Sequence, residues 1–271
     1  MTLALCATPI GNLADVTLRV LDELRAADVV LCEDTRHTRQ LLERHGVRAK
    51  LLSYHRHNEA ARIAELVPRL VAGERMALVS DAGLPGVNDP GARLVSAARD
   101  AGVPVTVLPG ASAVETALVA SGLAGAQYRF LGYVPRSERG RAELWLELVG
   151  WPHPSVAFES PKRLPATLAS LAATDGDRFV AVCRELTKLH EEVVCGTASS
   201  VAARFGEAPK GEVTLVIGPA RATGEADDAM VAAAASDVAE LVASGAQRKV
   251  AAGVVARLTG VARKTLYDCS L

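Results

Sequence analysis

The chain has 271 residues, 49% of them apolar and 23% charged, and a formal net charge of −1 at pH 7. This composition is typical of a soluble globular protein, and the length favours two domains over one. No stretch approaches the roughly eighteen uninterrupted apolar residues of a membrane span, and Met1 leads into a strand pattern without a signal segment, so we expect a cytoplasmic protein with no membrane partner.

Short apolar runs alternate with amphipathic stretches over residues 1–120. The runs predict β-strands at Leu3–Ala7, Asp28–Cys32, Lys50–Ser53, Met76–Ser80 and Pro104–Leu108. The amphipathic stretches predict helices that begin near Val16, Arg36, Asn58, Gly91 and Ala111. Such alternation favours a parallel sheet flanked by helices, and we expect an N-terminal α/β domain over 1–120.

Strand-like runs lie closer together over residues 121–220. They are YRFLGYV, SVAFES, FVAVC, EEVVC and EVTLVIG, and helical stretches are expected near 138–149, 161–173 and 197–205. Fewer crossovers between strands favour a mixed sheet. The predicted fold class is therefore α/β, with a second α/β domain over 121–220.

The end of the chain is helical by pattern but begins with a polar segment. Residues 220–236, ARATGEADDAMVAAAAS, predict a linker or the frayed start of a helix, with no packing face of their own. Two helices are expected at about Asp237–Ala243 and Arg248–Leu258, then a turn at Thr259–Gly260 and a third helix from Val261. Over 237–271 this spacing fits a helix-turn-helix or, equally well, a small helical cap with solvated basic side chains.

Two loops rich in glycine and proline follow predicted strands. In LVSDAGLPGVNDPG, residues 78–91, an apolar run stops at Asp81, and VTVLPGAS, residues 105–112, repeats the arrangement. In an open α/β sheet, ligands bind just outside the carboxyl ends of the strands, so Asp81 stands where a ligand is held. Two such loops on neighbouring strands predict a pocket with free backbone donors and acceptors.

Common nucleotide and metal motifs are absent from the sequence. No G-x-G-x-x-G follows a strand, and no G-x-x-x-x-G-K-[ST] occurs. His55 and His57 are two residues apart and Cys183 and His190 seven apart; neither spacing is typical of zinc ligands, and we expect no metal site. The five cysteines never occur at two-residue spacing, which favours reduced thiols.

Several ordered segments resemble a known family. They are ATPIGNLADVTLR (7–19), EDTRHTRQLL (33–42), SYHRHNE (53–59), LVSDAGLPGVNDPG (78–91), LPGASA (108–113), FLGYVPR (130–136), FESPKRL (158–164), CRELTKLHEE (183–192) and GEVTLVIGP (211–219). These segments resemble the ribosomal RNA small-subunit methyltransferase I family, a branch of the tetrapyrrole-methylase-like (class III) enzymes. The resemblance covers positions 3–219, and the tail from about 237 resembles the family's basic helical extension.

The resemblance implies a cofactor, a substrate and an assembly. It implies that S-adenosylmethionine binds in the cleft between the two α/β domains of the chain. It also implies that the protein is a homodimer. It also implies 2′-O-methylation of a cytidine ribose in the decoding centre of 16S ribosomal RNA, within the 30S subunit. The cofactor contacts carried over from the family are Pro9, Ile10, Asp81, Ala82, Gly83, Leu84, Ala111, Ser112, Ala113, Phe158, Leu186, Glu212, Val213 and Thr214.

A ribose hydroxyl is a poor nucleophile while it is protonated, so a carboxylate or imidazole within hydrogen-bond reach would help to remove its proton. The candidates for this catalytic role are Glu33, Asp34, His55, Glu59 and Glu185. Our hypothesis is that Glu59 or Asp34 orients or deprotonates the hydroxyl. The plain structural alternatives are helix capping by Asp34 and a salt-bridge network around Glu185.

Local clusters of basic residues predict an RNA-binding face. Arg36, His55 and Arg56 are expected to hold phosphates that flank the target ribose. The other predicted contacts are Arg136, Lys162, Arg163, Arg248, Lys249, Arg263 and Lys264.

Three other functions remain open from the sequence. A methyltransferase of the same class that acts on a small tetrapyrrole-like substrate would not need the basic tail or the histidine-rich segment 53–59. A non-enzymatic nucleic-acid-binding protein would leave the two loop systems without a purpose. Nucleotide hydrolysis lacks phosphate motifs and carboxylates spaced for magnesium.

Overall fold

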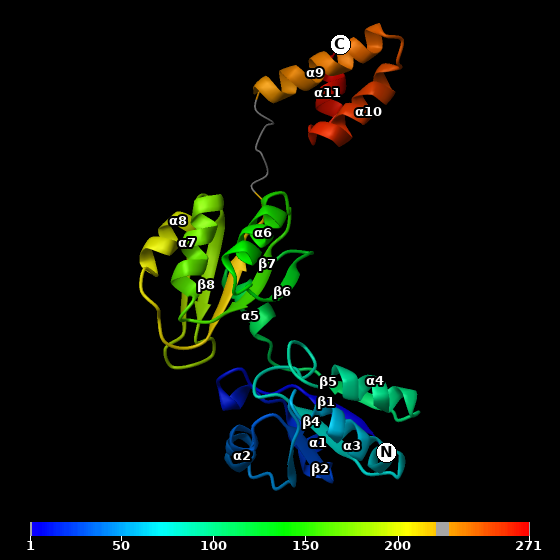
Figure 1. Ribbon diagram of the computed structural model, residues 1–271, viewed down its shortest axis with the longest axis vertical. Helices are drawn as coiled ribbons and strands as arrows, with labels where there is room; N and C mark the ends of the chain where they lie inside the picture. Colours follow the sequence, from blue (N-terminus) through cyan, green and yellow to red (C-terminus); the bar gives the residue numbers. More distant parts are fainter. Residues whose placement is uncertain (1, 221–227, 271) are drawn as a thin grey trace. The chain divides into compact units, whose positions relative to one another are not determined.

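A computed structural model describes residues 2–220 and 228–270 (Figure 1). The chain forms two compact units, residues 1–220 and 221–271. Within the described ranges, no helix has both the length and the apolar character needed to span a membrane.

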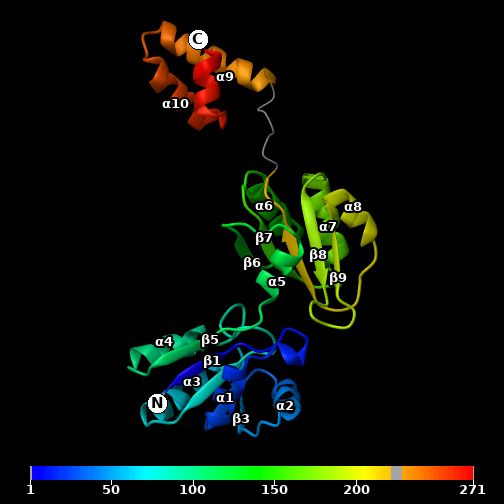
Figure 2. The same ribbon diagram turned by 180° about the vertical axis from the view of Figure 1, so that it is seen from behind.

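The first sheet consists of five parallel strands in the order β3-β2-β4-β1-β5. The strands are β1 Leu3–Cys6, β2 Val29–Cys32, β3 Leu51–Ser53, β4 Met76–Val79 and β5 Val105–Leu108. The helices of this region are a 3-10 turn at Leu13–Asp15, α1 Leu18–Ala26, α2 Thr35–Arg44, α3 Glu59–Val71 and α4 Ala92–Asp100. Side chains of α3 and α4 pack on one face of the sheet and those of α1 and α2 on the other (Figures 1 and 2). Because both faces are covered, β1, β2 and β4 are continuous apolar runs that are buried throughout.

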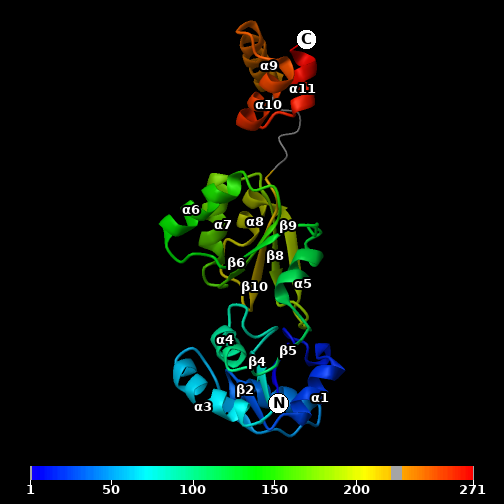
Figure 3. The ribbon, with the colours of Figure 1, turned by 90° about the vertical axis from the view of Figure 1, so that its right-hand side faces the viewer.

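The second sheet is mixed, with strand order β6-β7-β10-β8-β9. β6 pairs with β7 in parallel, and the other neighbours pair antiparallel. Its strands are β6 Arg129–Tyr133, β7 Ser155–Glu159, β8 Phe179–Arg184, β9 Glu192–Thr197 and β10 Val213–Ile217. The helices are α5 Ala113–Ala120, α6 Glu138–Val149, α7 Leu164–Thr174 and α8 Ala198–Arg204. Figure 3 shows α6, α7 and α8 on one face of this sheet and α5 on the other, and the two buried clusters divide in the same way.

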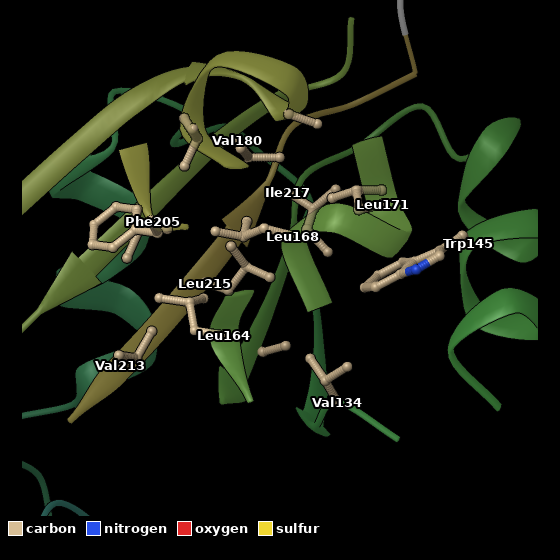
Figure 4. Close-up of a cluster of buried hydrophobic side chains, with 14 of the residues drawn as sticks. Val134, Trp145, Leu164, Leu168, Leu171, Val180, Phe205, Val213, Leu215 and Ile217 are labelled. Atoms are coloured by element: carbon tan, nitrogen blue, oxygen red, sulfur yellow. The ribbon is translucent and has the colours of Figure 1, made fainter. Parts of the chain in front are cut away.

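The core under α6, α7 and α8 contains Trp145, which lies near Leu171 of α7 in Figure 4 and belongs to one buried cluster with aliphatic residues of β8 and β10. Its indole Nε1 donates a hydrogen bond to Ser170 Oγ at 3.0 Å, which satisfies the one polar group that the ring buries. Arg178 is also buried, and its guanidinium donates to the carbonyl oxygens of Leu148 and Gly218. It therefore ties the end of α6 to the end of β10.

The C-terminal unit contains three helices, α9 Asp228–Ala243, α10 Arg248–Thr259 and α11 Arg263–Cys269. They pack around a small core that includes Val238, Val255 and Leu266. Gly260 ends α10 in the left-handed conformation with φ 76°, at the turn that the sequence predicts. The choice between a helix-turn-helix and a helical cap stays a prediction.

The start of α9 agrees with one of the two predicted alternatives and corrects another part of the prediction. Residues 228–236 form the start of a helix, while residues 221–227 lie outside the described ranges. Alanine is the best helix former, and Ala234, Ala235 and Val238 are buried at helical spacing. The alanine-rich segment therefore does have a packing face, made of small side chains.

The predicted fold class is confirmed: both sheets belong to an α/β structure, the first parallel and the second mixed. Predicted helix starts differ by a few residues. The helix expected near Val16 begins at Leu18, because Thr17 caps it through a hydrogen bond from Val20 N. The division of residues 1–220 into two domains at residue 120 stays a prediction.

Candidate active site

Three loops meet at the carboxyl edge of the first sheet. Thr8 N donates to Gly83 O at 2.8 Å, and Gly83 N donates back to Thr8 O at 3.1 Å, so the loops after β1 and β4 are paired. The loop after β5 approaches closely, since a Cβ at Gly110 would lie 2.8 Å from Ala7 Cβ. Backbone contact of this kind brings the loops of neighbouring strands to one place.

The loop after β2 joins this edge through acidic residues. Asp34 N donates to Asp81 Oδ1 at 3.1 Å. The Asp34 side chain accepts from Arg36 N at 2.8 Å, which caps α2, and forms an ion pair with the Arg36 guanidinium at 2.7 Å. The hydrogen bonds from Arg36 hold the pKa of the Asp34 carboxyl well below its usual range. Asp34 is therefore a weak proton acceptor in this conformation.

The second sheet contributes the end of β7. Glu159 is fully buried and forms an ion pair with Arg163 at 2.5 Å, while the Thr167 hydroxyl donates to it at 2.5 Å. These contacts hold the chain that follows β7. Phe158, the preceding residue, packs edge-on against Phe130 at 5.0 Å between ring centroids.

The segment after β8 is held by a network of charges. Lys188 Nζ lies 2.9 Å from Glu185 Oε1 and 3.0 Å from Glu212 Oε2. Glu185 also accepts a hydrogen bond from Glu212 N at 2.8 Å, and the Lys188 ammonium together with this bond lowers the pKa of Glu185. A Cβ at Gly211, where φ is +95°, would lie 2.4 Å from Glu185 Cγ. Only glycine fits at that position.

One hydrogen bond links this segment to the first sheet: Asn12 N donates to Thr187 Oγ1 at 3.0 Å. Residues at the ends of the strands of both sheets, and of the loops that follow them, line an open cavity of about 810 Å³. Its acidic lining is Glu33, Asp81, Asp89, Glu115, Glu159 and Glu212, and its larger apolar and aromatic lining includes Ile10, Leu84, Tyr128, Phe130, Tyr133, Phe158, Leu186 and Val213.

The cavity collects most of the cofactor contacts that the family resemblance implies. Ile10, Asp81, Ala82, Gly83, Leu84, Ala111, Ser112, Ala113, Phe158, Leu186, Glu212, Val213 and Thr214 all line it. Pro9 is buried beside it and is not a lining residue. Their contacts with a cofactor stay predictions.

Several lining residues were not predicted from the sequence, and those with polar side chains include Asp89, Glu115 and Tyr128. Glu115 accepts hydrogen bonds from the Ser112 and Tyr128 hydroxyls. A signal existed for Asp89, because NDPG closes the same glycine- and proline-rich loop that contains Asp81. Glu115 also had a local signal, because it lies three residues after Ser112 in a capping-box pattern at the start of α5, whereas Tyr128 lies outside the loops and no local pattern indicates it.

Asp89 has an unusual environment. It is half-buried, and no hydrogen bond or ion pair to its carboxylate occurs among the residues that the structure describes. Burial, reinforced by the charges of Glu33 and Asp81 and opposed by Arg56, raises its pKa to about 6.

The predicted proton acceptors Asp34, His55, Glu59 and Glu185 are not among the cavity-lining residues, whereas Glu33 is. Glu59 is buried and accepts hydrogen bonds from Tyr54 Oη at 2.9 Å and Gly91 N at 3.3 Å. His55 N donates to Asn58 Oδ1 at 2.9 Å in the neighbouring turn. The catalytic roles of these residues stay predictions.

The predicted RNA contacts differ in how free they are. Arg56 donates to Asn88 O at 2.5 Å, Arg163 is paired with Glu159, and Arg36 is paired with Asp34. Arg248 is partly buried. The other predicted contacts are exposed: Arg136, Lys162, Lys249, Arg263 and Lys264. Within the described ranges, no group of three or more His, Cys, Asp or Glu side chains is arranged to hold a metal ion.

The sequence and the fold are similar to those of known methyltransferases. The sequence pattern of the Tetrapyrrole (Corrin/Porphyrin) Methylases matches residues 2–202. Among solved structures, uroporphyrin-III-C-methyltransferase from Thermus thermophilus is similar with a TM-score of 0.56, at 21% identity, covering 81% of this chain and 94% of that one. Diphthine synthase is similar with a TM-score of 0.59, at 18% identity, covering 81% of this chain and 90% of that one. These two likenesses concern the fold.

Curated relatives are much closer in sequence. A protein of Micromonospora olivasterospora is 42% identical over 98% of this chain and 85% of its own length, and one of Synechocystis is 42% identical over 99% and 97%. Both are named ribosomal RNA small subunit methyltransferase I. The chain belongs to the tetrapyrrole methylase family, in the branch of ribosomal RNA small subunit methyltransferase I, and it is a methyltransferase.

Proposed function

We propose that the protein transfers a methyl group from S-adenosylmethionine to small-subunit ribosomal RNA, at the 2′-oxygen of a cytidine ribose in the decoding centre. The observation that carries this proposal is the cavity of about 810 Å³, formed in a methyltransferase fold by the loops at the strand ends. Its size falls within the range of small-molecule sites, roughly 300–1,000 Å³. The names of the curated relatives support the RNA substrate.

The lining of the cavity fits the proposed cofactor. Phe130, Phe158 and Leu186 offer apolar surface to a flat base, while the backbone of residues 82–84 and 110–113 offers polar groups. The carboxylate of Asp81 suits a cationic group of the cofactor. When bound, S-adenosylmethionine supplies a methyl group that is attached to a sulfonium sulfur. The neutral thioether is a good leaving group and does not need to be protonated.

The residues of the chain then have two tasks in this function. They hold the ribose oxygen in line with the methyl group, and they accept the proton that the oxygen loses. Ordered loops serve the first task, because the pairing of Thr8 with Gly83 and the bond from Asn12 to Thr187 hold the walls of the cavity. The second task needs a carboxylate that faces the cavity.

RNA binding would use exposed basic residues. Arg136 and Lys162 follow β6 and β7 of the larger unit, and Lys249, Arg263 and Lys264 lie on the C-terminal unit. Arg263 Nη2 donates to Lys249 O at 3.1 Å, so the N-terminal ends of α10 and α11 form one basic cluster. Such side chains bind phosphates without reading sequence.

The protein is further proposed to act in the cytoplasm as a homodimer on the 30S subunit. β5 is an edge strand with Val107 exposed, and Val119 of α5 is 68% exposed. Light scattering would give twice the monomer mass, and Val119→Lys would lower it if α5 lies in the interface. A monomeric mass for the unaltered chain would refute the dimer.

The test of the function is radiolabelled methyl transfer from S-adenosylmethionine to 30S subunits that lack the modification, to naked 16S RNA and to buffer alone. Label on one decoding-centre ribose, mapped by nuclease digestion, is the expected result. Label on a base, or at another ribose, would refute the proposed position. Cofactor binding without transfer to any RNA would favour a small-molecule acceptor instead.

A further inference from the structure

Asp89 lies in a loop that two other elements hold. Arg56, from the segment between β3 and α3, donates to the carbonyl oxygen of the preceding residue, Asn88, at 2.5 Å. Glu59, at the start of α3, accepts from Gly91 N at 3.3 Å, two residues beyond Asp89. The loop is therefore anchored on both sides of Asp89, which lines the cavity.

The charged groups around Asp89 come from three elements. Glu33 follows β2, Asp81 follows β4, and Arg56 lies between β3 and α3. Two carboxylates and partial burial oppose its ionisation, and the single guanidinium favours it. The net effect raises the pKa of Asp89 to about 6. A carboxylate with this pKa is ionised at neutral pH and is a stronger base than an ordinary aspartate.

Three of the other acidic candidates are committed to partners, whereas the fourth, Glu33, lines the cavity and is one of the charges that act on Asp89. Asp34 is paired with Arg36, and Glu185 with Lys188. Glu59 accepts two hydrogen bonds from protein groups. These three carboxylates are bonded to protein groups and do not line the cavity, whereas Asp89 lines it and has no such partner among the described residues.

We propose that Asp89 is the catalytic residue that accepts the proton of the ribose hydroxyl, and that Arg56 and Glu59 are positioning residues that hold its loop. This inference rests on the proposed function. In the step, the ribose O2′ loses its proton to an Asp89 carboxylate oxygen as an O2′ lone pair forms the bond to the methyl carbon. The carbon–sulfur bond breaks with its electron pair on sulfur, which becomes neutral, and Asp89 then releases the proton to solvent.

The experiment measures single-turnover methylation of 30S subunits by the full-length protein at saturating S-adenosylmethionine, from pH 5 to 9. The unaltered protein must transfer label first; if it does not, the proposed function fails before any variant is compared. Asp89→Asn should lower the rate constant by about 10²–10⁴-fold, and Asp89→Glu should recover part of it. Asp100→Asn, an exposed carboxylate on α4, is the matched control.

Two further readouts separate a proton acceptor from a structural residue. S-Adenosylhomocysteine, which lacks the sulfonium charge, should bind Asp89→Asn within about threefold of its affinity for the unaltered protein, as measured by calorimetry without turnover. The rate of the unaltered protein should fall below about pH 6, and Glu33→Gln should move that midpoint to lower pH because one repelling charge is removed. Glu33→Gln keeps Asp89 in place, so this readout does not depend on how the Asp89 variants fold.

Three results would overturn the proposal. The first is an Asp89→Asn rate above one third of the unaltered rate. The second is more than tenfold weaker binding of S-adenosylhomocysteine by that variant. The third is a midpoint that Glu33→Gln leaves unmoved.

Discussion

Removal of the charge at Asp89 should make the protein more stable although less active. The pKa of this carboxyl is raised from 3.8 to about 6 in the folded protein. Between these two values the folded state binds more protons than the unfolded state, so the free energy of unfolding falls as pH rises through this window. Below about pH 4 the penalty is absent, and above about pH 6 it is fully present.

The size of the penalty follows from the shift. A change of about 2 pKa units, at about 1.4 kcal/mol each, sets an upper limit of roughly 3 kcal/mol. Asp89 is only half-buried, so solvent reduces the value to about 1–2 kcal/mol at pH 7.5. Asparagine has the same shape without the charge. Asp89→Asn should therefore raise the unfolding temperature by about 2–4 °C per kcal/mol gained.

Differential scanning calorimetry of the full-length protein at pH 7.5 and pH 4.5 measures this effect. The variant should be the more stable protein at pH 7.5, and the difference should shrink at pH 4.5. The exposed control Asp100→Asn should change stability by less than about 0.5 kcal/mol. An Asp89→Asn protein that is less stable than the unaltered one at pH 7.5, or a gain of equal size at both pH values, would refute the electrostatic reasoning.

Three further predictions concern the anchors of the cavity and the tail. Glu59→Ala should destabilise the protein by about 2–4 kcal/mol, because Tyr54 Oη and Gly91 N lose a buried acceptor, and an unchanged unfolding temperature would contradict this. Gly211→Ala should displace Glu185 and thereby weaken S-adenosylhomocysteine binding, as measured by calorimetry. Gly206→Ala is the control and should leave binding unchanged, because the nearest atom would lie 3.9 Å from the new Cβ. Equal affinities of the two variants would contradict the predicted displacement. The double variant Lys249→Ala, Arg263→Ala should reduce the slope of log RNA affinity against log salt concentration by up to about two, with S-adenosylhomocysteine affinity unchanged. An unaltered slope would mean that the RNA does not contact these two residues.

Predictions from sequence were best where the signal is local. The buried runs of β1, β2 and β4 are continuous and apolar, and glycine and proline mark the loops that follow them. The resemblance to a family then indicated which loop residues line the cavity, and the structure brings those from residues 81–84 and 111–113 together. Helix boundaries were less accurate, because a cap such as Thr17 depends on one hydrogen bond.

The roles of the acidic residues could not be assigned in the same way. Asp34 and Glu59 lie in the segments that follow β2 and β3, where catalytic groups often occur, yet their carboxylates are bonded to Arg36 and Tyr54. The turn-like NDPG segment gave no indication of a role for Asp89, although this carboxylate lines the cavity and has no hydrogen-bond or ion-pair partner among the described residues. Which acid is free depends on neighbours that are distant in sequence.

The sequence by itself determined the strands, the loops and the family, because apolar periodicity and turn residues act over a few positions. The tertiary structure decided that Glu33 lines the same cavity as Asp81 and Asp89. Glu33 follows β2 and the two aspartates follow β4, and these strands are distant in the chain but neighbours in the sheet. It also decided that α9 packs through alanines. Electrostatic interaction and burial depend on distance in space, and a pattern of residues along the chain does not contain that distance.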